Sequence, residues 1–117
     1  MPKAPRNPIE SFANPHPDRE YLIEHEALEF TSLCPKTGQP DFGEILITYT
    51  PDRTCIELKA LKYYLQEYRN QGVFYEAATN RILDDLIACC QPRRMRITGA
   101  FSARGGITTT VVAEYTR

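Results

Sequence analysis

The sequence predicts an α+β domain in which a four-stranded antiparallel sheet carries two helices on one face, in the order strand, strand, helix, helix, strand, strand. Near both ends of the 117-residue chain, apolar residues alternate with polar ones, the period of a half-buried strand. In the middle of the chain they recur at spacings of three and four, which indicates amphipathic helices. Gly105 and Gly106 form a turn between the last two alternating segments, so an antiparallel hairpin is expected there.

Four alternating segments are expected to form the strands. The first runs from Tyr21 to Leu33 and the second from Glu44 to Thr50, with a Pro- and Gly-rich loop between them. The third strand is expected to place Met95, Ile97 and Phe101 on its inner side, and the fourth spans Ile107 to Thr116.

Two helices are expected between the strand pairs. The first follows Thr54 and stops at Gly72, with four apolar residues at helical spacing: Leu58, Leu61, Leu65 and Tyr68. The second runs from Tyr75 to Cys90, with Pro92 beyond its end and with an inner face made of Ala78, Ile82, Leu86 and Cys90.

The length and composition indicate one domain. Residues 1–17 are rich in Pro and polar groups and are expected to be a flexible arm, with the domain at 18–117. Neither a signal peptide nor an apolar stretch of membrane-spanning length is visible, so a cytoplasmic location is expected. The 14 basic and 15 acidic residues leave no basic footprint for direct nucleic acid binding.

The expected sheet has two open edges and an uncovered face. Such surfaces favour association between subunits, so we expect a homo-oligomer.

The cysteines are expected to have different roles. Cys55, Cys89 and Cys90 stand among apolar residues and are interpreted as small core residues. No spacing of Cys and His is typical of a zinc site, so no metal is expected.

Cys34 lies in a loop dense in Pro and Gly, directly after a predicted strand, where its side chain can face a pocket. A thiol needs a nearby base or positive charge to become a nucleophile. Asp41 follows seven positions later, and the turn residues between them could bring it back towards the sulfur. Beside Phe42, in an apolar pocket, its carboxyl could exchange protons with the thiol or a substrate. A core cysteine and a turn aspartate are the alternative interpretation.

Other segments also carry candidate binding residues. On a helix, Lys59, Lys62 and Tyr63 share one face, and two ammonium groups beside an aromatic ring could hold a phosphate and stack on a flat ring. By spacing alone, a solvated helix face is favoured over this binding role.

Glu76 could anchor a guanine-like edge through two N–H bonds, or it could simply stabilise the start of a helix. Arg104, followed by Gly105, could reach a phosphate, or the two could form a plain hairpin tip.

Taken together, three segments resemble the QueF family, the 7-cyano-7-deazaguanine reductases of queuosine biosynthesis, in its short single-module form. They are FTSLCPKTGQPDF at 30–42, ELKALKYYLQEYRNQGVFYE at 57–76 and GAFSARGGI at 99–107. The resemblance implies a tunnelling fold, whose subunits join their sheets into a barrel and stack as paired rings, giving a decamer-like homo-oligomer with sites between subunits.

The resemblance also implies residue roles. Cys34 would be the nucleophile that forms a thioimide with the nitrile, Asp41 the proton donor, and Glu76 the anchor of 7-cyano-7-deazaguanine, with Tyr75 and Glu57 as further substrate contacts. The NADPH site would comprise Lys59, Lys62 and Tyr63 with Arg104 and Gly105.

The chain departs from the family at two positions. Ala60 stands where Ser is frequent, which removes one potential phosphate hydrogen bond. Tyr75 stands where His is common, and a phenol titrating near pH ~10 cannot replace an imidazolium.

Other function classes stay open at this point. GTP cyclohydrolases share the fold but need zinc ligands, and no matching set is visible. A QueF-like amidinotransferase would keep the Cys and Asp but lose the cofactor helix. A non-catalytic purine- or pterin-binding oligomer would need neither of those two residues.

Overall fold

The structure is a computed structural model and describes residues 9–117. Its elements are β1 (Ser11–Ala13), β2 (Ile23–Leu33), β3 (Pro40–Thr50), β4 (Thr54–Ile56), α1 (Leu58–Gln66), the 3-10 helix η1 (Glu67–Asn70), α2 (Tyr75–Cys90), β5 (Arg94–Arg104) and β6 (Ile107–Thr116). The main sheet has the antiparallel order β2-β3-β5-β6, and β1 pairs with β4 in a second, two-stranded sheet. The expected α+β class and order of main elements are confirmed.

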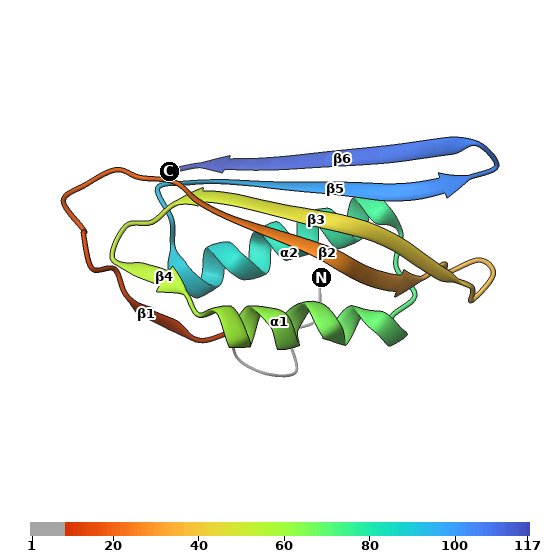
Figure 1. Cartoon of the computed structure of the whole chain (residues 1–117), viewed down its shortest axis with the longest axis horizontal. Coiled ribbons are helices and arrows are strands. Elements are labelled where there is room, and N and C mark those ends of the chain that lie inside the picture. The colour runs from red at the N-terminus through yellow and green to blue at the C-terminus, as the bar shows by residue number, and fades with distance from the viewer. Residues whose placement is uncertain (1–8) are drawn as a thin grey trace.

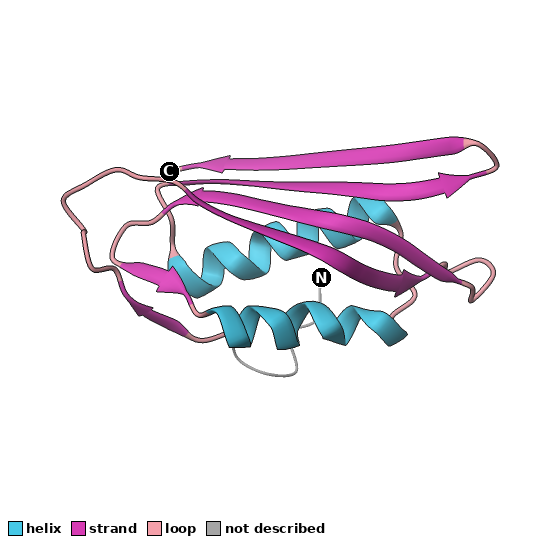
Figure 2. Ribbon diagram, viewed as in Figure 1, coloured by secondary structure: helices cyan, strands magenta, loops and turns pink. Residues whose placement is uncertain are grey.

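Both helices lie on the same face of the main sheet, and no other element of residues 9–117 covers the opposite face (Figure 2). The core forms where alternate residues of the central strands β3 and β5 meet the helices. Ile45 and Ile47 of β3 and Ile97 of β5 are fully buried. The expected inner face of α2 is confirmed, since Ala78, Ile82, Leu86 and Cys90 are all buried. Among the expected core cysteines, Cys55 and Cys90 are buried and Cys89 is half-buried.

Two boundaries differ from those expected. Strand β3 begins at Pro40 instead of Glu44, because residues 40–43 continue the ladder with the end of β2, where Asp41 pairs with Ser32. The loop between these strands is therefore short. The first helix begins at Leu58, and its α-helical part ends at Gln66, after which the chain tightens into η1, as is frequent at helix ends.

Part of the expected flexible arm is held against the domain. Residues 11–13 pair with β4, the Asn14 side chain donates a 2.7 Å hydrogen bond to the Asp52 carbonyl, and the Tyr21 hydroxyl donates to Asn14. Residues 11–14 of the expected arm are therefore in contact with the domain, and residues 1–8 of that arm lie outside the described part of the chain.

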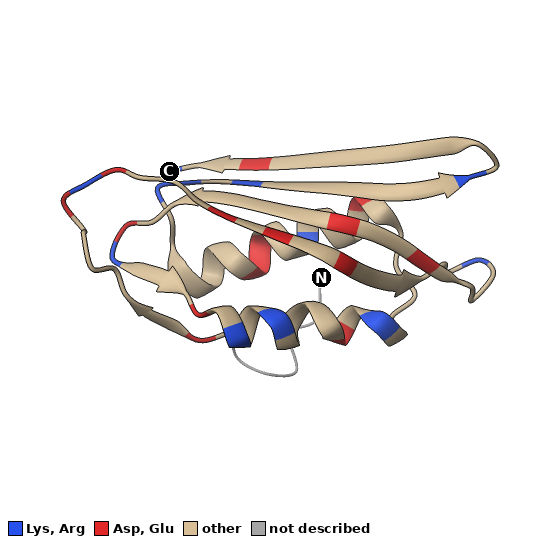
Figure 3. Ribbon diagram, in the orientation of Figure 1, with Lys and Arg blue, Asp and Glu red and all other residues tan. Residues whose placement is uncertain are grey.

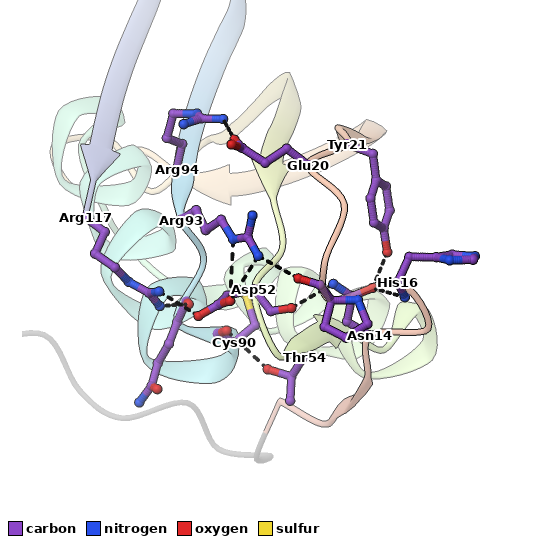
Figure 4. A network of polar contacts seen from close by, with 12 residues as sticks. Asn14, His16, Glu20, Tyr21, Asp52, Thr54, Cys90, Arg93, Arg94 and Arg117 are labelled. Atoms are coloured by element: carbon purple, nitrogen blue, oxygen red, sulfur yellow. Dashed lines mark hydrogen bonds and ion pairs between the residues drawn. The ribbon is translucent and has the colours of Figure 1, made fainter.

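Asp52 joins this segment to the C-terminus (Figure 4). Its carboxylate accepts from Arg117 at 2.6 Å and forms a longer, 3.4 Å ion pair with Arg93, whose guanidinium also donates to the Pro17 carbonyl at 2.7 Å. The hydrogen bond from Arg117 in particular holds the pKa of Asp52 below its ordinary value. The two ends of the described chain are thus tied to the β3–β4 turn.

No strand within residues 9–117 pairs with the outer edge of β2 or of β6, the two outer strands of the main sheet (Figure 1). Apolar side chains are exposed on both of them, including Leu28 on β2 and Val112 on β6. Acidic and basic residues are interspersed over strands and helices (Figure 3). No helix within residues 9–117 is long and apolar enough to cross a membrane.

Candidate active site

The Cys34 loop, residues 34–39, is a closed turn between β2 and β3. The Cys34 amide donates to the Gln39 carbonyl at 2.8 Å, and the Gly38 amide donates back to the Cys34 carbonyl at 2.8 Å. Gly38 has φ +72°, a conformation that suits glycine because it has no Cβ. This double closure holds the half-buried Cys34 at the mouth of the turn.

The turn also makes the Cys34 thiol acidic. Hydrogen bonding to the Thr37 side chain, and then to the backbone N–H groups of Thr37 and Lys36, lowers its pKa to about 7. A smaller contribution comes from a hydrogen bond with Arg104. A thiol with such a pKa is substantially ionised at neutral pH, and the thiolate is the nucleophilic form.

Asp41 is buried in β3, with an exposed fraction of 5%, and its Oδ1 accepts from Arg104 Nη1 at 2.6 Å. Arg104 also lowers the pKa of the Cys34 thiol, so the guanidinium faces both the thiol and the carboxylate. The structure thus brings together Cys34, Asp41 and Arg104 from three places in the sequence. Arg104 faces these two groups here, so its contact with a cofactor phosphate, like that of the exposed neighbour Gly105, stays a prediction.

Tyr75 forms the apolar wall beside this pair. Its ring stacks on Phe101 with 3.9 Å between centroids and 5° between planes. Burial, and then the neighbouring Asp41 carboxylate, raise the pKa of the Tyr75 hydroxyl. The expected neighbour Phe42 is instead 55% exposed, because it alternates with Asp41 along β3 and points to the other side of the sheet.

The start of α2 lies beside the end of β2 through two backbone hydrogen bonds. The Leu33 amide donates to the Gln71 carbonyl at 2.9 Å, and the Val73 amide donates to the Leu33 carbonyl at 3.1 Å. Residues 71–73 thus pair with Leu33, the residue before Cys34, and Glu76 follows them by three positions. It is exposed, and no residue within 9–117 donates a hydrogen bond to its carboxylate.

The residues expected to bind NADPH on α1 form the cluster that their spacing predicts. The Lys59 and Lys62 ammonium groups lie 5.9 and 5.8 Å from the centre of the Tyr63 ring, and all three side chains are exposed. Glu57, expected to contact substrate, caps α1 in this structure: its carboxylate accepts from the Lys59 and Ala60 amides at 2.8 and 2.9 Å. These bonds lower the pKa of Glu57.

A single chain does not bring the α1 cluster and Cys34 together. Helix α1 begins at the end of the domain that carries β4, whereas the β2–β3 loop and the β5–β6 turn lie at the opposite end (Figure 1). Within residues 9–117, no group of three or more His, Cys, Asp or Glu side chains is arranged to hold a metal ion.

Several known proteins are similar to this chain over nearly all of its length. The family of QueF-like proteins matches residues 40–117. NADPH-dependent 7-cyano-7-deazaguanine reductase of Nitrosococcus oceani is 58% identical over 98% of this chain and 89% of the relative. The proteins with the same name from Chlorobaculum tepidum and Rhodopirellula baltica are 61% and 54% identical, and each alignment covers more than nine-tenths of both chains.

The chain belongs to the QueF family. The fold agrees with that assignment: a crystal structure of the archaeosine synthase QueF-Like in its apo form superposes with a TM-score of 0.75, covering 80% of this chain and 91% of the other at 24% identity.

Within this QueF-family chain, sequence reasoning missed two features of the site. Thr37 is the main partner of the thiol, although it stood in the loop only as a turn residue. Leu33 pairs with residues 71–73, about 40 positions later in the sequence. A local sequence pattern cannot predict a parallel bridge between residues so far apart.

Proposed function

We propose that this chain is an NADPH-dependent 7-cyano-7-deazaguanine reductase, which converts a nitrile to an aminomethyl group in queuosine biosynthesis, with Cys34 as covalent nucleophile. The observation that carries the proposal is an acidic thiol beside a buried carboxylate–guanidinium pair, in a chain 58–61% identical to reductases of that name.

The first step is addition of the Cys34 thiolate to the electrophilic nitrile carbon. A C–S bond forms, and an electron pair of the triple bond moves to nitrogen. The proton that the Cys34 thiol gives up passes to the Asp41 carboxylate and from there to this nitrogen, so Asp41 ends the step ionised. The product is a thioimide covalently held at Cys34. Arg104 assists both groups, since it hydrogen-bonds Asp41 and lowers the pKa of the Cys34 thiol.

Reduction to the amine requires two hydrides, which the nicotinamide cofactor supplies when it is bound. After the first reduction the C–S bond breaks, and Cys34 leaves as thiolate to reveal an imine. The lowered pKa of Cys34 favours this departure, which a serine alkoxide would not achieve at neutral pH. The imine has to be shielded from water until the second reduction, so the site needs a cover.

The exposed face of α1 suits a phosphate-bearing dinucleotide. Lys59 and Lys62 supply two mobile cations, and the half-exposed Tyr63 supplies an aromatic face between them. The Ala60 side chain offers no hydrogen bond there, so binding of a phosphate at this face depends on the two lysines.

The separation of α1 from Cys34 in one chain supports a site shared between subunits in a homo-oligomer. The open edges of β2 and β6 are the surfaces on which copies could pair, and between α1 and β2 lies a groove of about 320 Å³. His25 lines this groove, and its buried Nε2 has no hydrogen-bond partner among residues 9–117. We propose stacked rings of a decamer-like assembly in the cytoplasm. Val112→Lys puts a charge on the helix-free face of the outer strand β6, and light scattering is expected to give a smaller particle for this variant than for the parent.

The decisive assay mixes protein, nitrile and NADPH and follows the cofactor's absorbance. Two NADPH molecules are expected to be consumed per nitrile, with the aminomethyl product detected by mass. Cys34→Ala is expected to abolish consumption, whereas Cys89→Ala, a half-buried thiol in the last turn of α2, retains it. Unchanged consumption in Cys34→Ala would rule out the covalent route.

A further inference from the structure

The spacing between the nucleophile and the substrate anchor depends on one short segment. Residues 71–73 cross between η1 and α2 and pair with Leu33, the residue before Cys34. They also lie against the loop itself, because a Cβ built on Gly72 would be 3.6 Å from Pro35 Cα. A shift of this crossing would move Glu76 relative to the sulfur.

The side chain of Gln71 fastens the crossing at both of its polar atoms. Its Nε2 donates to the Glu67 carbonyl at 3.2 Å, and its Oε1 accepts from Arg81 Nη1 at 2.7 Å. The Gln71 amide also donates to the Tyr68 carbonyl at 3.0 Å. Gln71 is thus bound to η1 by two hydrogen bonds and to α2 by one.

Arg81 provides the link to α2. It lies less than two turns after Glu76 on the same helix, is half-buried, and holds its guanidinium 5.7 Å from the centre of the Tyr68 ring. Tyr68 is buried, and its hydroxyl is 3.0 Å from that of Tyr64, which donates to Asp85 at 2.5 Å. The guanidinium is therefore fixed between a rigid aromatic cluster and the crossing.

We propose that Arg81 and Gln71 form a positioning brace that sets the distance between the Cys34 sulfur and the Glu76 carboxylate. Neither side chain is assigned a contact with substrate, so both act through the backbone of residues 71–73. The inference rests on the proposed function, since it gives Cys34 and Glu76 their roles.

The test compares Arg81→Met, Gln71→Met and the double variant with the parent, using the full-length oligomer. Each single variant is expected to slow thioimide formation at saturating nitrile about tenfold, because small misplacements of reacting groups are costly to rate. The double variant is expected to be no slower than either single, since the two residues act as a unit. Gln71→Glu keeps the acceptor for Arg81 but loses the donor to the Glu67 carbonyl, so its rate is expected to lie between those of the parent and Gln71→Met.

Two further measurements separate positioning from general destabilisation. Alkylation of Cys34 by iodoacetamide is expected to be unchanged in all variants, because the partners of the thiol are untouched. Arg53→Met, an exposed change in the β3–β4 turn, is the matched control and should equal the parent. Parental rates in Arg81→Met, a parallel fall in alkylation, or multiplicative effects in the double variant would each overturn the brace.

Amide hydrogen exchange tests, without any substrate, whether Arg81 holds residues 71–73 in place. The Val73 amide is expected to exchange faster in Arg81→Met, while the central Ile97 amide keeps its parental rate. Unchanged exchange at Val73 would contradict the brace. Absence of a thioimide in the parent would instead contradict the proposed function, and the exchange result would then decide the brace separately.

Discussion

Arg104 Nη1 lies 2.6 Å from Asp41 Oδ1, joining the end of β5 to the start of β3 directly beside the Cys34 loop. The carboxylate is 5% exposed and the arginine side chain 45% exposed, so the charge of a buried group is matched by one that reaches in from solvent. Arg104 also lowers the pKa of the Cys34 thiol. One guanidinium therefore orients both residues to which we assign the chemistry of the nitrile.

The acidity of Cys34 predicts the pH dependence of its reactivity. The pKa of the thiol is lowered to about 7, so the rate of iodoacetamide alkylation is expected to rise with pH through about 7 and to level off above it. Thr37→Val removes the largest stabilising contact of the thiolate, and the midpoint is expected to move upwards, towards the ordinary thiol value of about 8.5. Thr116→Val, at the far end of β6, should leave the midpoint in place.

Removal of the Arg104 guanidinium is expected to impair the covalent step. Arg104→Met leaves Asp41 buried without its ion partner and takes one hydrogen bond from the thiolate, so thioimide formation should slow at least about tenfold. Arg104→Lys keeps the charge but not the forked geometry of the guanidinium, so its rate of thioimide formation is expected to lie between those of the parent and Arg104→Met. Rapid-mixing mass analysis of the Cys34 adduct measures these rates. An Arg104→Met rate equal to that of the parent would show that the guanidinium does not assist the covalent step.

Loss of the Glu76 charge is expected to weaken substrate binding and to spare the thiol. A hydrogen bond to a charged group contributes about 1.5–3 kcal/mol, so Glu76→Gln should raise KM for the nitrile by roughly ten- to a hundredfold. Cys34 alkylation should not change, because Glu76 is not among the partners of the thiol. Glu44→Gln, an exposed change in β3, is the control. A KM unaffected by Glu76→Gln would show that Glu76 does not anchor the nitrile substrate.

Gly99 is expected to tolerate no side chain. A Cβ there would come within 2.8 Å of both the Phe101 ring and Thr79 Oγ1, and Phe101 carries the stacked Tyr75 ring. Gly99→Ala should therefore lower the free energy of unfolding by about 1–3 kcal/mol, as overpacking does. It should also reduce turnover, because a displaced Phe101 ring would move the Tyr75 ring that stacks on it. Chemical denaturation measures the first effect, with the exposed Ala100→Ser as the control. Parental stability would show that the strand can shift to make room.

Local periodicity was sufficient to predict the framework of this fold. The helical spacing from Tyr75 to Cys90 and the alternation through Met95 and Ile97 record which side chains meet the core, and burial at these positions follows the pattern. The start of β3 could not be predicted, because Pro40 and Gly43 are typical of loops. There the cross-strand ladder with β2 overrides local preference, and Gly43 is required since a Cβ would lie 2.7 Å from the Phe101 ring.

The site was predictable only in part, for a similar reason. The sequence and its family resemblance pointed to Cys34 and Asp41, and the structure places both beside Arg104. The partners that tune them, such as Thr37 and the stacked Phe101, depend on tertiary geometry. Glu57 shows the converse: its carboxylate caps α1, a local role that its position before a helix could have indicated.

The most direct test of the account is the mass of the protein after incubation with 7-cyano-7-deazaguanine in the absence of NADPH. We expect the intact mass to increase by one nitrile molecule per chain, peptide mapping to place the increase on Cys34, and addition of NADPH to restore the original mass. A protein that gains no mass, or an adduct that persists in Cys34→Ala, would contradict the covalent mechanism.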